Sequence, residues 1–378
     1  MLAASEPGTP DAISRQVARF FYNGENTCSP PVSPSMPEPL EQRPEQLLAP
    51  DLLNKIERFG GDWTRKKLEA LSHYLRGYVK ALNMQSSLKL FYIDAFAGAG
   101  ICRLSATGSR SKGNSHPALF DITSGDEPDA EVIAGSALRA MSLDPQFSHY
   151  YFIEKDSGRA ETLNGLCQTV LGDPRRYTLL IGDANFELRK LIDDIDWRRH
   201  PYPRAVVFLD PYAVNVEWET LRSLFATKAV DVWYLINTAT IQRLLRKDPG
   251  AMTEASKATL DRIFGTRQWE TVVYQDAHED PEEGQQMQIF ANPSASPIES
   301  EIEKSFSMPA LAKFIADRAR EDLGAWVYPK ALPLRNSRQA VSFCLMFMMA
   351  NADHRATSLA SRLVRGIFKG QEGYELGD

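Results

Sequence analysis

Residues 90–100 read LFYIDAFAGAG, and this stretch decides the fold of the chain. The apolar, aromatic run that ends in Asp94 is typical of a strand covered on both faces. Gly98 and Gly100 lack a Cβ, so a ligand can lie directly on the main chain there. An acid at a strand end beside such a loop is how a nucleoside is held at the edge of a parallel sheet. The stretch therefore predicts a nucleoside-binding turn.

The spacing of the glycines distinguishes two kinds of nucleotide site. The dinucleotide fingerprint G-x-G-x-x-G needs a third glycine, and Arg103 stands in its place here. This disfavours a nicotinamide dehydrogenase. The form D-x-F-x-G-x-G, which includes Phe96, instead resembles the first motif of class I S-adenosylmethionine (SAM) methyltransferases. A tight strand-to-helix turn that binds no ligand is the structural alternative.

Length and composition bound the class of protein. At 378 residues the chain is long enough for one large or two ordinary domains, and 43% apolar and 24% charged residues are typical of a globular protein. No apolar run reaches the ~18 residues that a membrane span needs, and the N-terminus shows no secretory signal. The net charge of −6 gives no basic excess, so a nucleic-acid substrate is neither required nor excluded.

Neither the cysteines nor the histidines suggest a metal site. The four cysteines are scattered without a C-x-x-C pair, which argues against zinc and against a disulfide framework. The six histidines are isolated and lack metal-ligand spacing. We therefore expect no metal, and a reduced, cytoplasmic setting.

The chain divides into four segments. Residues 1–50 hold nine of the 23 prolines and predict a disordered tail. Residues 51–240 form the expected SAM-binding core. Residues 241–323 are expected to be a largely helical insertion, and residues 324–378 a strand pair and a helix that complete the core.

Strands and helices alternate within the core. The strand candidates are residues 90–95, 149–154, 177–181, 205–210 and 231–236, with a C-terminal pair at 325–334 and 341–349. Helices are expected at 68–82, 158–170, 186–192, 218–226 and 356–369. Such alternation means a parallel sheet with right-handed crossovers. We therefore predict an α/β fold with a Rossmann-like, doubly wound, mostly parallel sheet of seven strands and a helical insertion.

A long segment, residues 101–135, separates the first strand from a helix that begins near Ser136. It is polar and glycine-rich, and loops of this kind are more often lids or binding elements than plain connections. Arg103, Arg110 and Lys112 make it locally basic. A basic loop suits a phosphate-bearing substrate, although a solvated loop has the same composition.

Further acids stand at the ends of the later strands. Glu154 closes the second strand, Asp183 follows the third together with Asn185, and Asp210 closes the fourth. In a doubly wound sheet these ends meet at one edge, where SAM needs partners for its ribose and adenine. Acids are also common helix N-caps, which explains Asp183 equally well. Glu154 lies 60 residues after Asp94 instead of the expected ~20, and the segment 101–135 accounts for the excess.

Asp210, Pro211 and Tyr212 are the candidates for the methyl acceptor. An amine that attacks SAM needs its hydrogens held, and the Asp210 carboxylate and the Pro211 carbonyl can accept them. The Tyr212 ring can stack on a flat base. A strand-end turn around an apolar tyrosine is the alternative. Methylases of base amines usually show [D/N]-P-P-[Y/F/W], and the second proline is missing here.

Taken together, these motifs resemble the three-Cys-motif partner (TcmP) family over roughly residues 60–370. The resemblance rests on the helix from Lys67, on the glycine loop, and on GSAL at 135–138, FIEKD at 152–156, GDAN at 182–185, FLDPY at 208–212 and NS at 336–337. Ala99 and Ala213 replace an expected proline and glycine. The resemblance implies the methyltransferase fold and a cytosolic partner that carries a three-cysteine motif.

The sequence therefore predicts a SAM-dependent methyltransferase. Asp94, Gly98 and Gly100, with Phe96 in the same motif, are expected to hold the methionine end of SAM. Glu154 is expected to bind the ribose, and Asp183 and Asn185 the adenine side. Asp210, Pro211 and Tyr212 are expected to position the acceptor, for which an amine nitrogen of a nucleobase is favoured. The alternative is a SAM-fold subunit that binds the partner protein and catalyses nothing.

Overall fold

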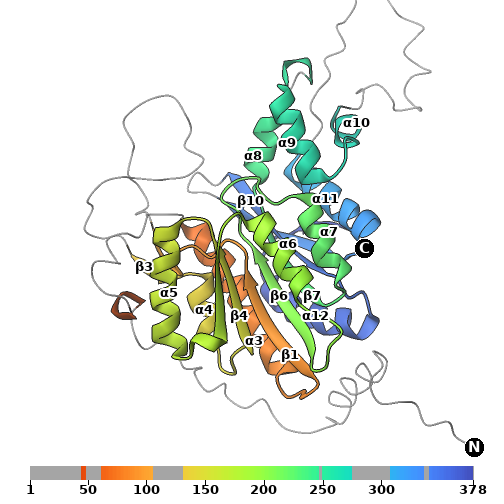
Figure 1. Ribbon diagram of the computed structural model, residues 1–378. Coiled ribbons are helices and arrows are strands. Elements are labelled where there is room, and N and C mark those ends of the chain that lie inside the picture. Colours follow the sequence, from red (N-terminus) through yellow and green to blue (C-terminus); the bar gives the residue numbers. More distant parts are fainter. Residues whose placement is uncertain are drawn as a thin grey trace, which may run out of the picture.

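The apolar runs of the sequence form the central strands of one sheet (Figure 1). The computed structural model describes residues 44–47, 61–104, 131–246, 249–274, 307–335 and 340–377. Its parallel strands are β1 (Leu88–Asp94), β4 (His149–Glu154), β5 (Tyr177–Ile181), β6 (Tyr202–Leu209) and β7 (Val230–Ile236). The predicted strands differ from these bounds by at most three residues. Buried strands carry nearly continuous apolar runs, which is why the sequence located them.

The strand order identifies the fold. Along the sheet it is β5-β4-β1-β6-β7-β10-β9-β11, and β10 (Val341–Met349) runs antiparallel to both of its neighbours β7 and β9 (Lys330–Arg335). The chain passes from β1 to β4 on one side and reaches β6 on the other, so the order reverses beside β1. Ligands of open α/β sheets bind at such a reversal, outside the carboxyl ends of the strands. This confirms the predicted Rossmann-like class I methyltransferase fold.

The sheet is larger than predicted, because nine strands of the described residues take part instead of seven. The count rises because the expected strand 325–334 forms two strands, of which the first is β8 (Trp326–Val327), and because β11 (Tyr374–Glu375) was not predicted. The expected strand 325–334 is interrupted, since β8 and β9 pair separately with β10. Pro329 lies in the interruption and has no N–H to donate to a ladder.

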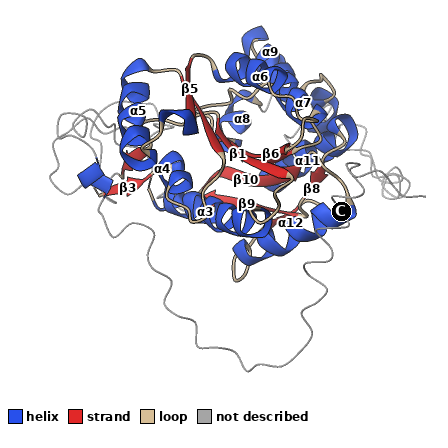
Figure 2. Ribbon diagram, turned by 60° about the horizontal axis from the view of Figure 1, so that its bottom comes forward, coloured by secondary structure: helices blue, strands red, loops and turns tan. Residues whose placement is uncertain are grey.

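Helices cover both faces of the sheet (Figure 2). On one face lie α3 (Asp62–Leu82), α4 (Ser136–Met141), α5 (Ser157–Leu171) and α12 (His354–Ile367). On the other lie α6 (Ala184–Asp194), α7 (Trp218–Ala226) and the helices between β7 and β8. We call the first of these faces the α3 face.

The described part of the predicted insertion packs into the same core as the sheet. It contains α8 (Thr238–Leu244), α9 (Glu254–Phe264), α10 (Trp269–Val273) and α11 (Met308–Leu323). Leu260, Trp269 and Leu311 are buried in one cluster with strand residues such as Val232. Helix α8 also runs across the expected boundary at residue 241. These helices therefore extend the sheet's core instead of forming a separate one.

The segment 101–135 was predicted to be a loop, but its two ends form a pair of strands. Strands β2 (Ile101–Arg103) and β3 (Val132–Ala134) form an antiparallel pair, and Ile101, Ile133 and Ala134 bury their side chains. Residues 105–130 lie outside the described residues, with Arg110 and Lys112. So do the residues 336–337 and most of the expected tail, of which the structure describes a short 3-10 helix, Pro44–Leu47. In the described ranges, no helix is long and apolar enough to span a bilayer.

Candidate functional site

The predicted acids Asp94, Glu154 and Asp210 converge on one face of the sheet. The residues two positions before them, Tyr92, Phe152 and Phe208, all pack in the cluster of the α3 face. Because side chains alternate along a strand, the three acids point to that face as well. Strand β1 pairs with both β4 and β6. Asp94 therefore lies between the other two acids, at the point where the strand order reverses.

Asp94 is fully buried at the end of β1. Its carboxylate accepts hydrogen bonds from the Tyr92 hydroxyl (3.1 Å), the Phe96 backbone N–H (3.3 Å) and Ser136. Burial and the nearby charge of Asp210 together raise the pKa of Asp94 to about 6, although these hydrogen bonds oppose the rise. An acid this buried is held in place by the fold.

The two glycines of the loop have different surroundings, although both have positive φ, +60° at Gly98 and +78° at Gly100. A Cβ on Gly98 would meet no atom within 4 Å, whereas a Cβ on Gly100 would lie 2.7 Å from Leu166 and 2.9 Å from Leu163 of α5. The absent Cβ of Gly100 thus lets helix α5 pack closely. Open main chain beside the loop, which was predicted for both glycines, is found at Gly98.

Glu154 is tied to this loop and to the start of α5. Its Oε2 accepts from the Gly98 N–H (2.9 Å), and its Oε1 accepts from the Asp156 N–H (2.8 Å). The Arg159 guanidinium donates to the same Oε1 from Nη2 (2.9 Å) and Nε (3.1 Å). Both carboxylate oxygens of Glu154, the residue predicted to bind the ribose, therefore accept hydrogen bonds from the protein. Sequence reasoning missed Arg159, which shares the carboxylate with any ligand there.

Asp183 is the N-cap of α6, the alternative that the sequence left open. Its carboxylate accepts from the backbone N–H groups of Asn185 (3.1 Å) and Phe186 (3.4 Å). One carboxylate oxygen makes both bonds, so the other has lone pairs left for a ligand. The Phe186 side chain, 60% exposed, stands beside it.

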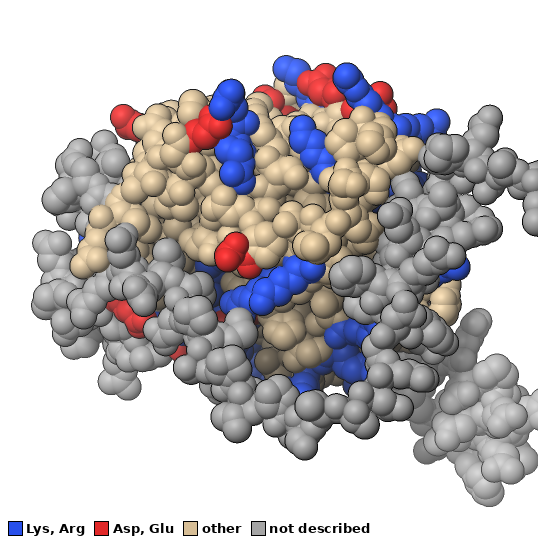
Figure 3. Space-filling model, turned by 90° about the horizontal axis from the view of Figure 1, so that it is seen from below, with Lys and Arg blue, Asp and Glu red and all other residues tan. Residues whose placement is uncertain are grey.

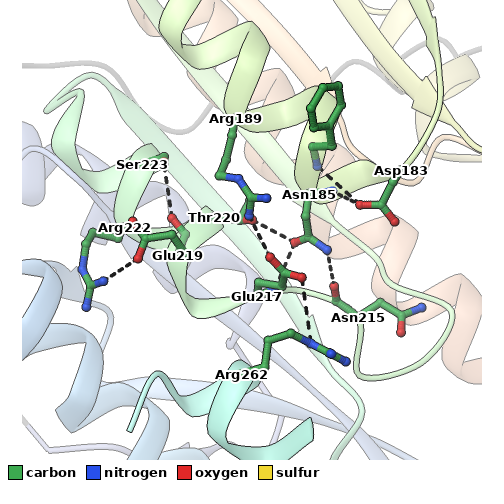
Figure 4. A network of polar contacts seen from close by, with 11 residues as sticks. Asp183, Asn185, Arg189, Asn215, Glu217, Glu219, Thr220, Arg222, Ser223 and Arg262 are labelled. Atoms are coloured by element: carbon green, nitrogen blue, oxygen red, sulfur yellow. Dashed lines mark hydrogen bonds and ion pairs between the residues drawn. The ribbon is translucent and has the colours of Figure 1, made fainter. Parts of the chain in front are cut away.

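The Asn185 amide binds the protein itself (Figure 4). Its Nδ2 donates to the Asn215 carbonyl (2.7 Å), and its Oδ1 accepts from the Glu217 N–H (3.0 Å) and the Thr220 hydroxyl (2.8 Å). Arg189 adds bonds to Glu217 and Thr220 at 2.8 and 3.0 Å. The amide thus fastens the segment after Asp210 to α6. For the predicted contact with adenine, the Asn185 side chain has one N–H left. Its other N–H and its carbonyl oxygen already bond to the protein.

Asp210 forms an ion pair that was not predicted. Lys67 of α3 donates to its Oδ2 at 2.6 Å, and the Lys67 side chain is 2% exposed while that of Asp210 is 20% exposed. The Lys67 ammonium also lies 4.8 Å from the centroid of the Trp63 ring, a cation–π contact. A buried lysine thus holds the acid of the acceptor motif.

The sequence contained a signal for Lys67. Trp63, Lys67, Leu71 and Tyr74 recur at helical spacing, which places a lysine on the apolar face of an amphipathic helix. A charge on that face requires a partner, because an unpaired buried charge is costly. The partner lies 143 positions further along the chain, so the sequence showed the need for one without identifying it.

The other two residues predicted to position the acceptor come directly after Asp210 in the chain. Pro211 is buried, and Tyr212 is 41% exposed beside Asp210. Among the residues that the structure describes, no group of three His, Cys, Asp or Glu side chains is arranged to hold a metal ion. The surface seen from below carries Lys and Arg side chains, several of them beside Asp and Glu side chains, with uncharged surface around them (Figure 3).

The strand order thus defines a Rossmann-like fold of the class I methyltransferase type. No family model matches the chain, and no curated protein matches it. Among solved structures it is similar to a DUF519 protein from Legionella pneumophila, with 12% identity, 82% of this chain and 92% of that chain covered, and a TM-score of 0.38.

The chain is also similar to two further solved structures. Trm1 from Pyrococcus horikoshii, solved with S-adenosyl-L-methionine, shares 12% identity over 76% of this chain and 55% of its own, with a TM-score of 0.34. A putative O-methyltransferase from Klebsiella pneumoniae shares 12% over 80% and 91%, with a TM-score of 0.33. Because these scores are low, the assignment of the fold rests on the strand order.

Proposed function

We propose that the protein is a SAM-dependent methyltransferase. The observation that carries this proposal is the convergence of Asp94, Glu154 and Asp210 on one face at the reversal of strand order. Class I methyltransferases bind SAM along this edge. The open main chain at Gly98 supplies the close approach that the methionine end of SAM needs.

The roles of the cofactor residues follow their positions. Asp94 binds the SAM ammonium and Gly98 lies against the methionine chain. Glu154 accepts from the ribose hydroxyls while keeping its bond to the Gly98 N–H. The second oxygen of Asp183 faces the adenine side. Phe96 and Gly100 shape the loop, and Asn185 acts mainly by holding the segment after Asp210.

The acceptor role falls to Asp210, Pro211 and Tyr212. Lys67 occupies Oδ2 of Asp210, so Oδ1 is the oxygen that accepts an N–H from the attacking amine. The Pro211 carbonyl accepts the other, and Tyr212 stacks on the ring that carries the amine. SAM is already activated, so the protein contributes mainly by positioning the two reactants. A nucleobase amine is the favoured acceptor. We place the protein in the cytoplasm, with a three-Cys-motif protein as its partner.

A variant of Asp210 tests this proposal. Asp210→Ala alone would leave Lys67 buried without its partner, so the change is made together with Lys67→Met. We expect SAM affinity in the double variant to stay within a few-fold of the wild type, measured by calorimetry. Methyl transfer from labelled SAM to RNA and DNA from cells lacking the protein should disappear. Equal loss of both would show that Asp210 does not serve the acceptor, and SAM binding without transfer by the wild type would favour the non-catalytic subunit.

A further inference from the structure

Asn237 carries a buried hydrogen-bond donor that has no partner in the described part of the chain. It is 2% exposed and directly follows β7. Its Oδ1 accepts from the Thr240 N–H (3.0 Å) and so caps α8, which fixes the orientation of the amide. Its Nδ2 has no hydrogen-bond partner among the described residues. Leaving such a donor unsatisfied costs about 1–3 kcal/mol, which suggests that a ligand normally satisfies it.

Asn237 lies on the same face and edge of the sheet as Asp210. Leu235, two residues before Asn237, packs in the cluster of the α3 face, as does Phe208 before Asp210. Strands β6 and β7 are paired in parallel, with Leu209 opposite Tyr234. Strand spacing and rise then place the Cα atoms of Asp210 and Asn237 about 8 Å apart. Both side chains are therefore within reach of one planar ring.

Asp210 offers the complementary group. Lys67 holds its Oδ2, and in the described part of the chain its Oδ1 accepts no hydrogen bond. Thr64, one turn before Lys67 on α3, also has a buried hydroxyl without a partner there. The Lys67–Asp210 pair is thus flanked by unused polar groups on two elements, which is unusual for a packed interior.

We propose that Asp210 and Asn237 together recognise the Watson–Crick edge of adenine or cytosine, where an exocyclic amine stands beside a ring nitrogen with a free lone pair. This inference rests on the proposed methyltransferase function. One N–H of the amine donates to Oδ1 of Asp210, and Nδ2 of Asn237 donates to the ring nitrogen. The amine lone pair then forms a bond to the methyl carbon of SAM. The carbon–sulfur bond breaks, its electron pair stays on sulfur, and the proton of the methylated nitrogen passes to Asp210.

Other acceptors fit this pair of groups less well. A lysine amine has no lone-pair neighbour, so Asn237 would stay unsatisfied. Uracil and hypoxanthine present a carbonyl beside a ring N–H, which opposes both protein groups. The Watson–Crick edge of guanine places an N–H beside its amine. Adenine and cytosine are thus the bases whose Watson–Crick edge offers a donor to Asp210 and an acceptor to Asn237.

Asn237→Asp is the sharpest test, because aspartate keeps the N-cap and replaces the donor by an acceptor. Wild type and variant are incubated with deuterated SAM and with RNA and DNA from cells lacking the protein, and the digested nucleosides are identified by mass spectrometry. We expect label on the exocyclic nitrogen of adenine or cytosine. The variant should lose about tenfold to a hundredfold in kcat/KM for the acceptor, with its SAM dissociation constant within threefold. If Asn237→Asp does not fold, Asn237→Ser, which also keeps a capping oxygen, takes its place and should likewise lose kcat/KM for the acceptor.

The outcomes separate the two claims. Label on guanine, on an oxygen or carbon atom, or on a lysine side chain would overturn this inference and leave a methyltransferase. A change in kcat/KM below twofold in a folded Asn237 variant would overturn it too. SAM binding without transfer to RNA or DNA would do the same. Absence of SAM binding by the wild type would instead overturn the proposed function itself.

Discussion

The carboxylate of Asp210 is shared between the fold and the candidate site. Its Oδ2 bonds to a buried lysine, while the side chain stays partly exposed. Removing one partner of a buried pair is costly because the other charge is left uncompensated, whereas replacing both partners with apolar groups can be nearly neutral. The pair therefore makes Asp210 both a structural residue and a candidate functional residue.

Lys67→Met should lower the free energy of unfolding by about 3 kcal/mol or less, since Asp210 retains some contact with solvent. The reason is that Asp210 loses its ionic partner. Urea denaturation measures the effect. Lys66→Met, at an exposed lysine on the same helix, is the matched control and should change stability little. The double variant Lys67→Met with Asp210→Ala should be less destabilised than the sum of the single variants, and strict additivity would contradict the pairing.

The pKa of Asp94 predicts how SAM affinity depends on pH. The carboxyl is protonated below about pH 6 and ionised above it. Only the ionised form attracts the SAM ammonium, so affinity should rise as pH increases from 5 to 7 and then level off. Calorimetric titrations across this range measure the profile. Asp94→Asn should bind SAM more weakly and lose this pH dependence, and a wild-type affinity that is constant from pH 5 to 7 would contradict the role of Asp94.

The loop after β1 and helix α5 act as one unit. The backbone N–H groups of Ala95 and Ala97 bond to the carbonyls of Phe208 and Ile153, so the loop is fastened to both neighbouring strands. Gly98 bonds to Glu154, and Gly100 lies against Leu163 and Leu166. One glycine is thus available to a ligand, and the other is needed for packing.

Two alanine variants should separate these functions. Gly100→Ala adds an overpacking cost of about 1–3 kcal/mol to the left-handed backbone cost of about 1–2 kcal/mol. Gly98→Ala has the backbone cost alone, because its Cβ meets no atom. We expect Gly100→Ala to be clearly the less stable in urea denaturation, and Gly98→Ala to lose more SAM affinity per unit of stability lost. The reverse order would contradict the assignment of the two glycines.

A buried contact joins α3 to the sheet at the opposite end of the strands. Asp231, at the start of β7, accepts from the Tyr74 hydroxyl of α3 at 2.6 Å. Burial raises the pKa of Asp231 to about 7, although the Tyr74 bond and the charge of Arg204 oppose the rise. An acid with a raised pKa stabilises the fold while protonated, and this contribution is lost as the pH rises from about 4 to about 7.

Asp231→Asn should therefore gain stability relative to the wild type as the pH rises through this window. The difference in the free energy of unfolding is expected to be on the order of a few kcal/mol. Urea denaturation at pH 5, 6 and 7.5 measures it. Asp193→Asn, at an exposed acid of α6, is the control and should show little pH-dependent difference. A wild-type curve parallel to that of Asp231→Asn would mean that Asp231 is already ionised throughout.

Much of this architecture could be predicted because it is local in sequence. The parallel strands can be recognised as apolar runs in the sequence, and β4 and β5 have the predicted bounds. The positions of the acids at strand ends follow from these runs. The predicted number of seven strands was too low, because the division of the strand 325–334 into β8 and β9 was not foreseen and the two-residue strand β11 is too short to show a pattern.

What could not be predicted depends on contacts between distant residues. The Lys67–Asp210 pair joins a helix and a strand end that are far apart in the chain. The hydrogen bonds of the Asn185 amide to Asn215 and Glu217 depend on the path of the segment after Asp210. The unpaired donor of Asn237 appears only once its neighbours are placed. Sequence periodicity reports which face a residue occupies, and it does not report what lies opposite.

The central claim is that the edge built by Asp94, Gly98 and Glu154 binds SAM. Calorimetric titration of the pure wild-type protein with SAM, and separately with NAD, tests it most directly. We expect one SAM bound per chain, no heat of binding with NAD, and a SAM affinity at least tenfold lower in Asp94→Asn. Binding of NAD, or no binding of SAM, would contradict it.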